Sequence, residues 1–169
     1  MSKTRIRSLR LRFPIVIALS VLLAAPVFSQ GASIAFGNIR QDSAAPVEIS
    51  ADNMAINQKT GTATLTGNVL IGQGAMRLSA ASVNVVYSQD REQIASLQAS
   101  GDVTLVSGED AAEAQNAEYD INSGLIVLTG DVLLVQGPTA ITADSMRVDT
   151  QAGTARMEGR VKTVLNGDN

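Results

Sequence analysis

The chain of 169 residues contains no cysteine, histidine or tryptophan, and aromatic residues make up 3% of it. Without cysteine no disulfide can form, so the stability of the fold must come from a packed core. Without histidine or cysteine the commonest general base, the thiol nucleophile and the usual zinc ligands are all missing. Catalysis would depend on carboxylates together with Lys59, Lys162, Tyr87 or Tyr119. We therefore predict a protein that is not an enzyme and that holds no metal and no cofactor.

A glycoside hydrolase built on two carboxylates is an open alternative, because such an enzyme needs no histidine. Asp52 and Asp144 are acids at equivalent places in the repeat described below. We predict instead that both lie in turns, where an aspartate side chain bonds to its own backbone. Exposed aromatics that would bind a sugar are scarce, since the predicted body contains only Tyr87 and Tyr119.

The first 29 residues have the composition of a secretory signal peptide. Five basic residues precede an apolar run over residues 14–27, and no acidic residue occurs before Asp42. The run is short for a membrane span and has the length of the apolar region of a signal peptide. We predict cleavage between Ser29 and Gln30 and export to the periplasm. An uncleaved membrane anchor is the alternative.

Removal of residues 1–29 would leave eight basic and sixteen acidic residues, a net charge of −8. Binding to nucleic acid is disfavoured, because it requires a basic face that replaces phosphate counterions. Residues 30–45 are small and polar without a sustained period, and we predict a flexible lead-in there. The body at residues 46–165 is long enough for one domain with its own core, and residues 166–169 form a polar tail.

The body is organised around a pattern that recurs four times. The first copy, residues 47–71, reads VEISADNMAINQKTGTATLTGNVLI. Apolar and polar residues alternate in it, as they do in strands, and residues 58–61 have the composition of a hairpin turn. Equivalent positions in successive copies are 29, 34 and 29 residues apart, starting from Ile49. Such a period is typical of stacked supersecondary units that bury an apolar face against one another.

Every copy carries a glycine, a polar residue and a valine at the same place. The four steps are Gly67-Asn-Val69, Gly101-Asp-Val103, Gly130-Asp-Val132 and Gly159-Arg-Val161. A ligand-binding glycine loop is the alternative interpretation, but the chain has no GxGxxG motif followed by a helix. Because glycine inside a strand marks a bulge or a bend, we predict that the strands turn a corner of the sheet here. We predict no helix longer than one turn after residue 30.

The apolar excess of the body has two interpretations that the residues alone leave open. In Leu125–Val135 both faces of the strand are apolar. This pattern fits the core of an ordinary sandwich. It also fits a dry groove between two sheets, lined by aliphatic residues and by methionines that adapt to irregular apolar ligands.

Three segments of the body resemble the OstA-like family of lipopolysaccharide-transport proteins. They read PVEISADNMAINQKTGTATLTGNVLIGQGAMRLSAASVNV, YDINSGLIVLTGDVLLVQG and ITADSMRVDTQAGTARMEGRVKTVL. The resemblance covers residues 46–165 and implies an all-β fold, a β-jellyroll of stacked antiparallel strands with open edges at both ends. It implies a periplasmic protein that shields lipid A acyl chains in an apolar groove and bridges the inner and outer membranes. Without signal cleavage, the chain would resemble the membrane-anchored, LptC-like members.

The resemblance also implies which residues meet lipid and partners. The apolar interior that would bind lipid is assigned to Val47, Ile49, Met54, Ile56, Leu65, Val69, Leu78, Val83, Val85, Leu105, Tyr119, Ile121, Leu128, Met146 and Val148. Partner contacts through the first strand (47–50) and the last strand (159–165) are assigned to Val47, Glu48, Ile49, Ser50, Arg160, Val161, Lys162 and Thr163.

The implied partners are lipopolysaccharide, an LptC-like inner-membrane protein, an LptD-like outer-membrane protein and head-to-tail copies of the chain. Open strand edges accept another chain by β-augmentation, and a head-to-tail contact propagates. Arg156, Arg160 and Lys162 would blunt the last edge or meet an acidic partner, and a solvated surface is the preferred alternative. A structural filament of stacked repeats without lipid cargo is the alternative function.

Overall fold

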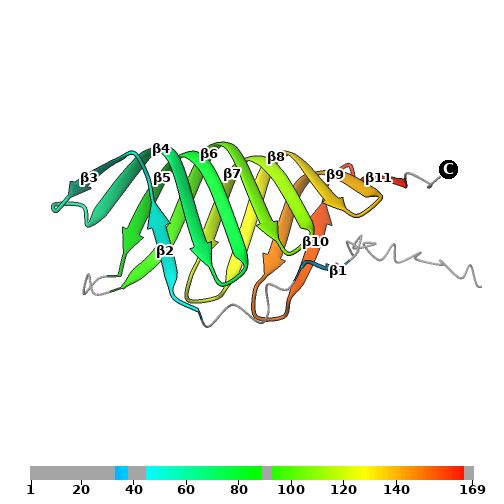
Figure 1. Cartoon of the computed structure of the whole chain (residues 1–169), viewed down its shortest axis with the longest axis horizontal. Helices are drawn as coiled ribbons and strands as arrows, with labels where there is room; N and C mark the ends of the chain where they lie inside the picture. Colours follow the sequence, from blue (N-terminus) through cyan, green and yellow to red (C-terminus); the bar gives the residue numbers. More distant parts are fainter. Residues whose placement is uncertain (1–32, 38–44, 89–92, 166–169) are drawn as a thin grey trace, which may run out of the picture.

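The computed structural model describes residues 33–37, 45–88 and 93–165, and these form an all-β structure (Figure 1). The strands are β1 (Ser33–Ala35), β2 (Val47–Ser50), β3 (Asn53–Asn57), β4 (Thr62–Gln73), β5 (Met76–Tyr87), β6 (Ile94–Ser107), β7 (Asp110–Asp120), β8 (Leu125–Gln136), β9 (Thr139–Asp149), β10 (Thr154–Glu158) and β11 (Lys162–Leu165). No helix occurs among the described residues, as predicted, and so none there has the length and apolar content of a membrane span.

The strands form one antiparallel sheet in which successive strands mostly lie side by side. Their order is β1-β10-β9-β8-β7-β6-β5-β4-β2, while β3 also pairs with β4 and β11 also pairs with β9. Antiparallel neighbours can be joined by short hairpin turns, and the turn predicted at residues 58–61 joins β3 to β4. The predicted fold class, stacked antiparallel strands with an open edge at each end, is confirmed.

The long strands bend at one place, which we call the corner. The pairing of β4 with β5 shifts register between Thr66 and Val69, and β6 and β8 shift at the equivalent places. Gly67 and Asn68 both have positive φ, at 77° and 45°. Glycine adopts this left-handed conformation without a Cβ clash, which explains its recurrence at the corner. The corner predicted from the Gly-polar-Val step is therefore confirmed.

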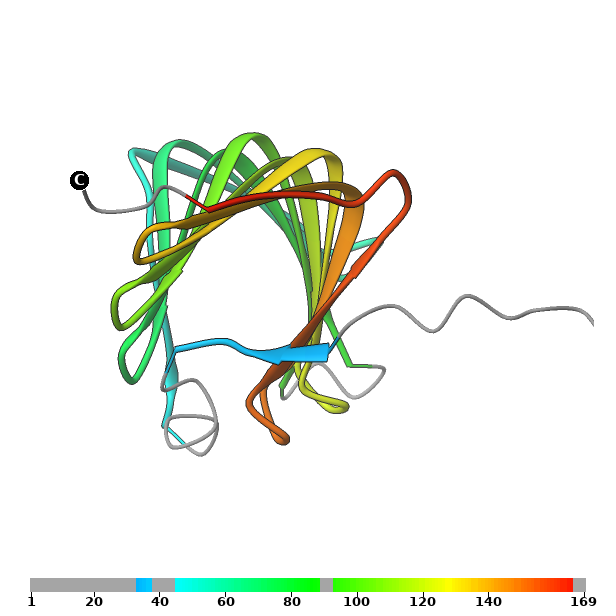
Figure 2. The ribbon, with the colours of Figure 1, turned by 90° about the vertical axis from the view of Figure 1, so that its right-hand side faces the viewer.

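The corner divides the sheet into two half-sheets that face each other. The first half-sheet contains β3, residues 62–66 of β4, the matching halves of β5 to β9, and then β10 and β1. The second contains β2, residues 69–73 of β4, the other halves of β5 to β9, and β11. In Figure 2 the corner lies at the top, and the opposite side, which we call the seam, lies at the bottom.

Alternate residues of both half-sheets point inward and form one apolar core. The core residues are at most 9% exposed, and the largest fully buried ones include Phe36, Leu65, Leu105 and Met146. Because side chains in a strand alternate between the two faces, one face of the sheet is apolar and the other is mostly polar. The interior is therefore packed with side chains rather than open.

The structure corrects two of the predicted segment boundaries. Residues 33–37 fall in the predicted flexible lead-in, yet β1 pairs with β10 and Phe36 is fully buried. Small residues without periodicity gave no signal of this pairing, because it depends on a strand edge that comes much later in the chain. The last strand is shorter than predicted, since β11 begins at Lys162 rather than at Gly159. The predicted signal peptide and polar tail lie outside the described residues.

Candidate functional site

The interior between the half-sheets is the candidate site, and most of the residues predicted for it lie there. Leu65, Val83, Val85, Tyr119, Leu128, Met146 and Val148 point inward from the first half-sheet, and Val69, Leu78 and Leu105 from the second. All ten are at most 2% exposed. The strand register inferred from alternation therefore holds along the length of the sheet, although contact of these residues with a lipid stays a prediction.

Five residues predicted for the interior are less buried, because they lie near the ends or margins of the stack. Val47, Ile49 and Ile121 are half-buried and pack against the core. Met54 and Ile56 are 59% and 65% exposed, which corrects their assignment to the closed interior.

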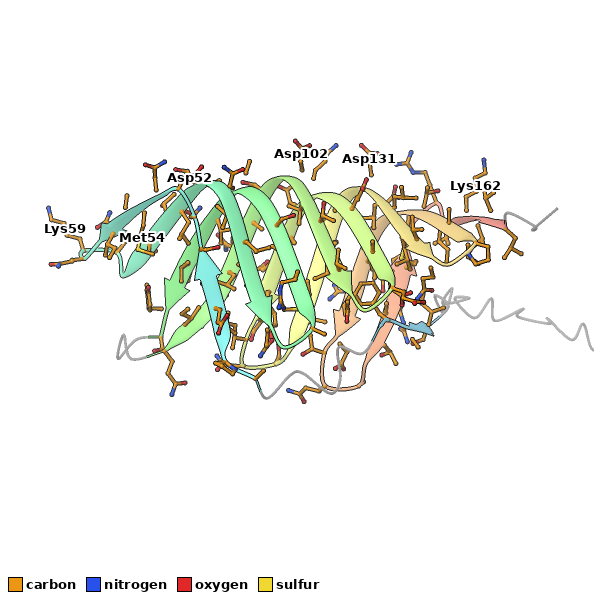
Figure 3. All side chains as sticks on the ribbon, viewed as in Figure 1. Asp52, Met54, Lys59, Asp102, Asp131 and Lys162 are labelled. Carbon is orange, nitrogen blue, oxygen red and sulfur yellow. The ribbon has the colours of Figure 1, made fainter. Side chains whose placement is uncertain are left out.

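Met54 and Ile56 nevertheless lie on the inward face. Their cross-strand partners are Leu65 and Ala63, both buried, and directly opposed residues of an antiparallel pair share one face. β3 is the outermost strand of the first half-sheet at this end, so no further strand covers these two side chains. Figure 3 shows Met54 beside the projecting hairpin that carries Lys59. The apolar inward face thus continues beyond the closed part of the molecule.

Three polar residues that sequence reasoning missed lie along the seam: Gln73, Ser107 and Gln136. They occupy the same position in successive copies, the last inward position of the strand, two residues after Ile71, Leu105 and Leu134. The Tyr119 hydroxyl donates a 2.7 Å hydrogen bond to Gln73 Oε1, and Gln73 Nε2 donates to the Ala45 carbonyl at 3.0 Å.

Burial raises the pKa of Tyr119 above its ordinary value, and side-chain hydrogen bonds to Thr150 and Gln73 partly oppose this effect. The phenol is therefore a neutral hydrogen-bond donor at physiological pH. The alternation that placed Ile71 and Leu105 inward would also have found Gln73 and Ser107. They were missed because polar residues were not considered as interior positions.

Charged and polar side chains line the outer side of the corner rather than the interior. Asp52 accepts a hydrogen bond from Asn68, and Asp144 accepts two from Arg160, at 2.8 and 2.6 Å. The hydrogen bond that Arg160 donates to Asp144 raises the pKa of Arg160. The prediction that Asp52 and Asp144 bond their own backbone is therefore wrong, because their carboxylates accept hydrogen bonds from the left-handed residues Asn68 and Arg160 across the corner. Asp144 also lies within β9 rather than in a turn.

The equivalent pair in the third copy is Gln115 and Asp131, at 2.9 Å, and Figure 3 shows Asp52, Asp102 and Asp131 along the outer edge. Within the described ranges, no group of three or more acidic side chains is placed to hold a metal ion. The hydrogen bonds at the corner therefore link neighbouring segments of the bend, and the interior stays the candidate site.

The two ends of the stack expose strand edges. Within the described part of the chain, β2 pairs only with β4 and β11 pairs only with β9. The predicted contact residues Val47, Glu48, Ile49 and Ser50 form β2, and Lys162 and Thr163 open β11. Arg160 and Val161 precede β11, and Arg160 belongs to the corner. Each end also exposes apolar side chains, Met54 and Ile56 at one end and Val161 (50%) and Leu165 (74%) at the other.

The chain matches a family model and is similar to solved structures. The model of one family, described as LptA/(LptD N-terminal domain) LPS transport protein, matches residues 48–161. Among solved structures, the chain is similar to LptH from Pseudomonas aeruginosa, described as the LptA homologous periplasmic component of the conserved lipopolysaccharide transport device. That likeness has a TM-score of 0.65 and 17% identity, covers 75% of this chain and 99% of that one, and supports the fold. No curated protein sequence matches the chain.

Proposed function

Because the chain belongs to the LptA/(LptD N-terminal domain) family of LPS transport proteins, we propose that it is a periplasmic carrier that shields lipid A acyl chains between its two half-sheets. The observation that carries the proposal is the largely apolar inward face, which extends from Met54 at one end to Leu165 at the other. We propose a binding role without catalysis.

The physical need for such a carrier follows from the cost of exposing acyl chains to water. Each methylene costs about 0.8 kcal/mol to expose, so a chain of about a dozen methylenes costs on the order of 10 kcal/mol. A lipid with several chains therefore needs a continuous apolar path through an aqueous compartment. The inward face offers aliphatic side chains, together with the adaptable Met146 and Met157, along that path.

Loading would require the half-sheets to separate at the seam. The inward side chains are closed off from water in this structure. Acyl chains can therefore enter only where the half-sheets, which are the two walls of the interior, move apart. The corner keeps β4 to β9 continuous between the half-sheets, and the strand ladders run along each half-sheet. Opening at the seam therefore loses core contacts while the ladders stay intact. A lipid that binds the open form more tightly shifts the population towards it.

The proposed lipid contacts are the fifteen predicted interior residues, with Met54 and Ile56 as an entrance or exit. A photo-crosslinking amino acid at Ile49, Leu65 or Tyr119 tests them, and outward-facing Thr64 is the control. We expect labelling by lipopolysaccharide from the inward positions alone. Folded variants without labelling at any inward position would refute the carrier and favour a structural filament.

We further propose that copies associate head to tail to bridge the two membranes. The β2 and β3 end of one copy would meet the β11 end of the next, which continues both the sheet and its apolar inward face. The same two edges would pair with an LptC-like inner-membrane protein and an LptD-like outer-membrane protein. Support comes from the sides of β2 and β11 that pair with no other described strand, and from the exposed apolar side chains beside them.

A further inference from the structure

We propose that residues 33–37, which we call the strap, close the seam reversibly and that Phe36 fills an interior site that an acyl chain takes once the strap leaves. This inference rests on the proposed carrier function. In Figure 2 the strap crosses the seam from β10 on one wall towards the opposite wall. It is the chain's own N-terminal segment, and it follows the predicted signal cleavage site.

The strap is attached to the first half-sheet by a short ladder. Three residue pairs join β1 to β10, from Ser33 with Arg156 to Ala35 with Thr154. Beyond them, the Phe36 amide donates to the carbonyl of Gly153, in the turn between β9 and β10, at 3.3 Å. By comparison, β8 and β9 share ten residue pairs. The strap is therefore among the most weakly paired elements of the sheet.

The strap is attached to the second half-sheet through Asp110. One carboxylate oxygen of Asp110 accepts a hydrogen bond from the Gly37 amide and another from Gln136 Nε2, both at 2.7 Å. Gln136 Nε2 also donates to the carbonyl of Ala35 at 2.9 Å. The strap thus contacts both half-sheets along the seam. While it is in place, the half-sheets cannot move apart at this end.

Phe36 is the part of the strap that enters the interior. Its side chain is 0% exposed and belongs to the apolar core cluster. A phenyl ring and an acyl chain need the same dry, apolar surroundings. Because the interior is already packed, a lipid chain must replace side chains there. Phe36 is a large buried side chain on a short segment at the margin of the sheet, so it can leave without disrupting a central strand.

The contact beneath the strap is imperfect in a way that favours release. Gly37 has a φ of 49° and lies so close to the Ser107 carbonyl that a Cβ there would clash with it. The Ser107 hydroxyl is buried there, and it has no hydrogen-bond partner among the residues that the structure describes. A buried hydroxyl without a partner is unfavourable, and departure of the strap would give it access to water. The closed state is therefore stabilised less than its apolar contact alone would suggest.

A reversible disulfide tests the strap directly. Ser33→Cys with Arg156→Cys would link β1 to β10, and the chain has no other cysteine to compete. Binding of fluorescent lipopolysaccharide is measured on the full mature protein before and after reduction. The control pair, Asn84→Cys with Gln98→Cys, links two neighbouring central strands on the outer face and leaves the strap free.

We expect the oxidised strap variant to bind at least about tenfold more weakly than its reduced form, whereas the control pair binds equally in both states. Equal binding by the oxidised and reduced strap variant would overturn the inference and leave the carrier function standing. Absence of binding by every form, including the unmodified protein, would refute the carrier function and the inference with it.

A second variant distinguishes the specific role of Phe36 from a general loosening of the structure. Phe36→Ala removes the ring, and we expect lipopolysaccharide to bind about tenfold more tightly. Val127→Ala truncates a half-buried, outward-facing residue of β8 and serves as the control, with no gain in affinity expected. Unchanged or weaker binding by Phe36→Ala, or an equal gain in both variants, would contradict the role of Phe36.

Discussion

Tyr119 and Gln73 join the inner faces of the two half-sheets through a buried 2.7 Å hydrogen bond between residues 46 positions apart. Gln73 also holds the carbonyl of Ala45, which comes just before β2. The amide group of Gln73 therefore connects the two walls and the start of the body. Because polar groups are costly to bury without partners, this link fixes how the walls meet at the seam.

Replacement of Tyr119 by Phe should destabilise the protein by about 1–3 kcal/mol, because it removes the buried hydrogen bond from the Tyr119 hydroxyl to Gln73 Oε1. Urea denaturation would measure the loss. Tyr87→Phe is the matched control, since Tyr87 is half-buried and no hydrogen bond of its hydroxyl occurs among the described residues. Equal stability of Tyr119→Phe and the unmodified protein would show that the link contributes nothing.

Alkaline pH should weaken the fold through the same tyrosine. In the unfolded chain a tyrosine ionises near its ordinary pKa of 10.0, whereas burial raises the pKa of Tyr119 in the folded state. Below pH 10 both states keep the proton, so Tyr119 adds no pH dependence there. As pH rises above 10, the unfolded state loses the proton first and is favoured. Between pH 8 and 11, the midpoint temperature of thermal unfolding should fall less steeply for Tyr119→Phe than for the unmodified protein.

Substitution at the corner should be costly for a conformational reason. Gly130 has a φ of 85°, and an added Cβ would lie 2.8–3.0 Å from side-chain atoms of Gln115. We expect Gly130→Ala to lose about 1–3 kcal/mol. Gly72 has no positive φ, and its Cβ would meet Arg77 at an ordinary 3.5 Å. A loss from Gly72→Ala as large as that from Gly130→Ala would contradict the explanation.

The exposed apolar end should control association. Met54→Glu with Ile56→Glu places two charges on the inward face at the β3 end, where the proposed head-to-tail contact forms. Asn84→Glu with Gln98→Glu adds the same charge on the outer face and is the control. Sedimentation velocity should show mass that rises with concentration in the native and control proteins but not in the first variant. If the variant with Met54→Glu and Ile56→Glu still associates, the contact between copies does not involve the apolar side chains at the β3 end.

The family was recognisable from sequence because its repeats carry local signals. Alternation assigned the inward face, and the recurring Gly-polar-Val step located the corner, since both follow from backbone geometry within a few residues. Ten of the fifteen residues predicted for the interior are buried there because each of them has a neighbouring strand on both sides. The sequence by itself therefore determined the repeat, the strand register and the bend.

The tertiary structure alone decided what happens at the ends and along the seam. The positions of Met54 and Ile56 follow the predicted register, but the stack stops at β3 and leaves both exposed. Phe36 enters the core because β10 offers an unpaired edge, and Tyr119 reaches Gln73 because the corner turns one wall towards the other. These contacts join residues that are distant in sequence, so no local period encodes them.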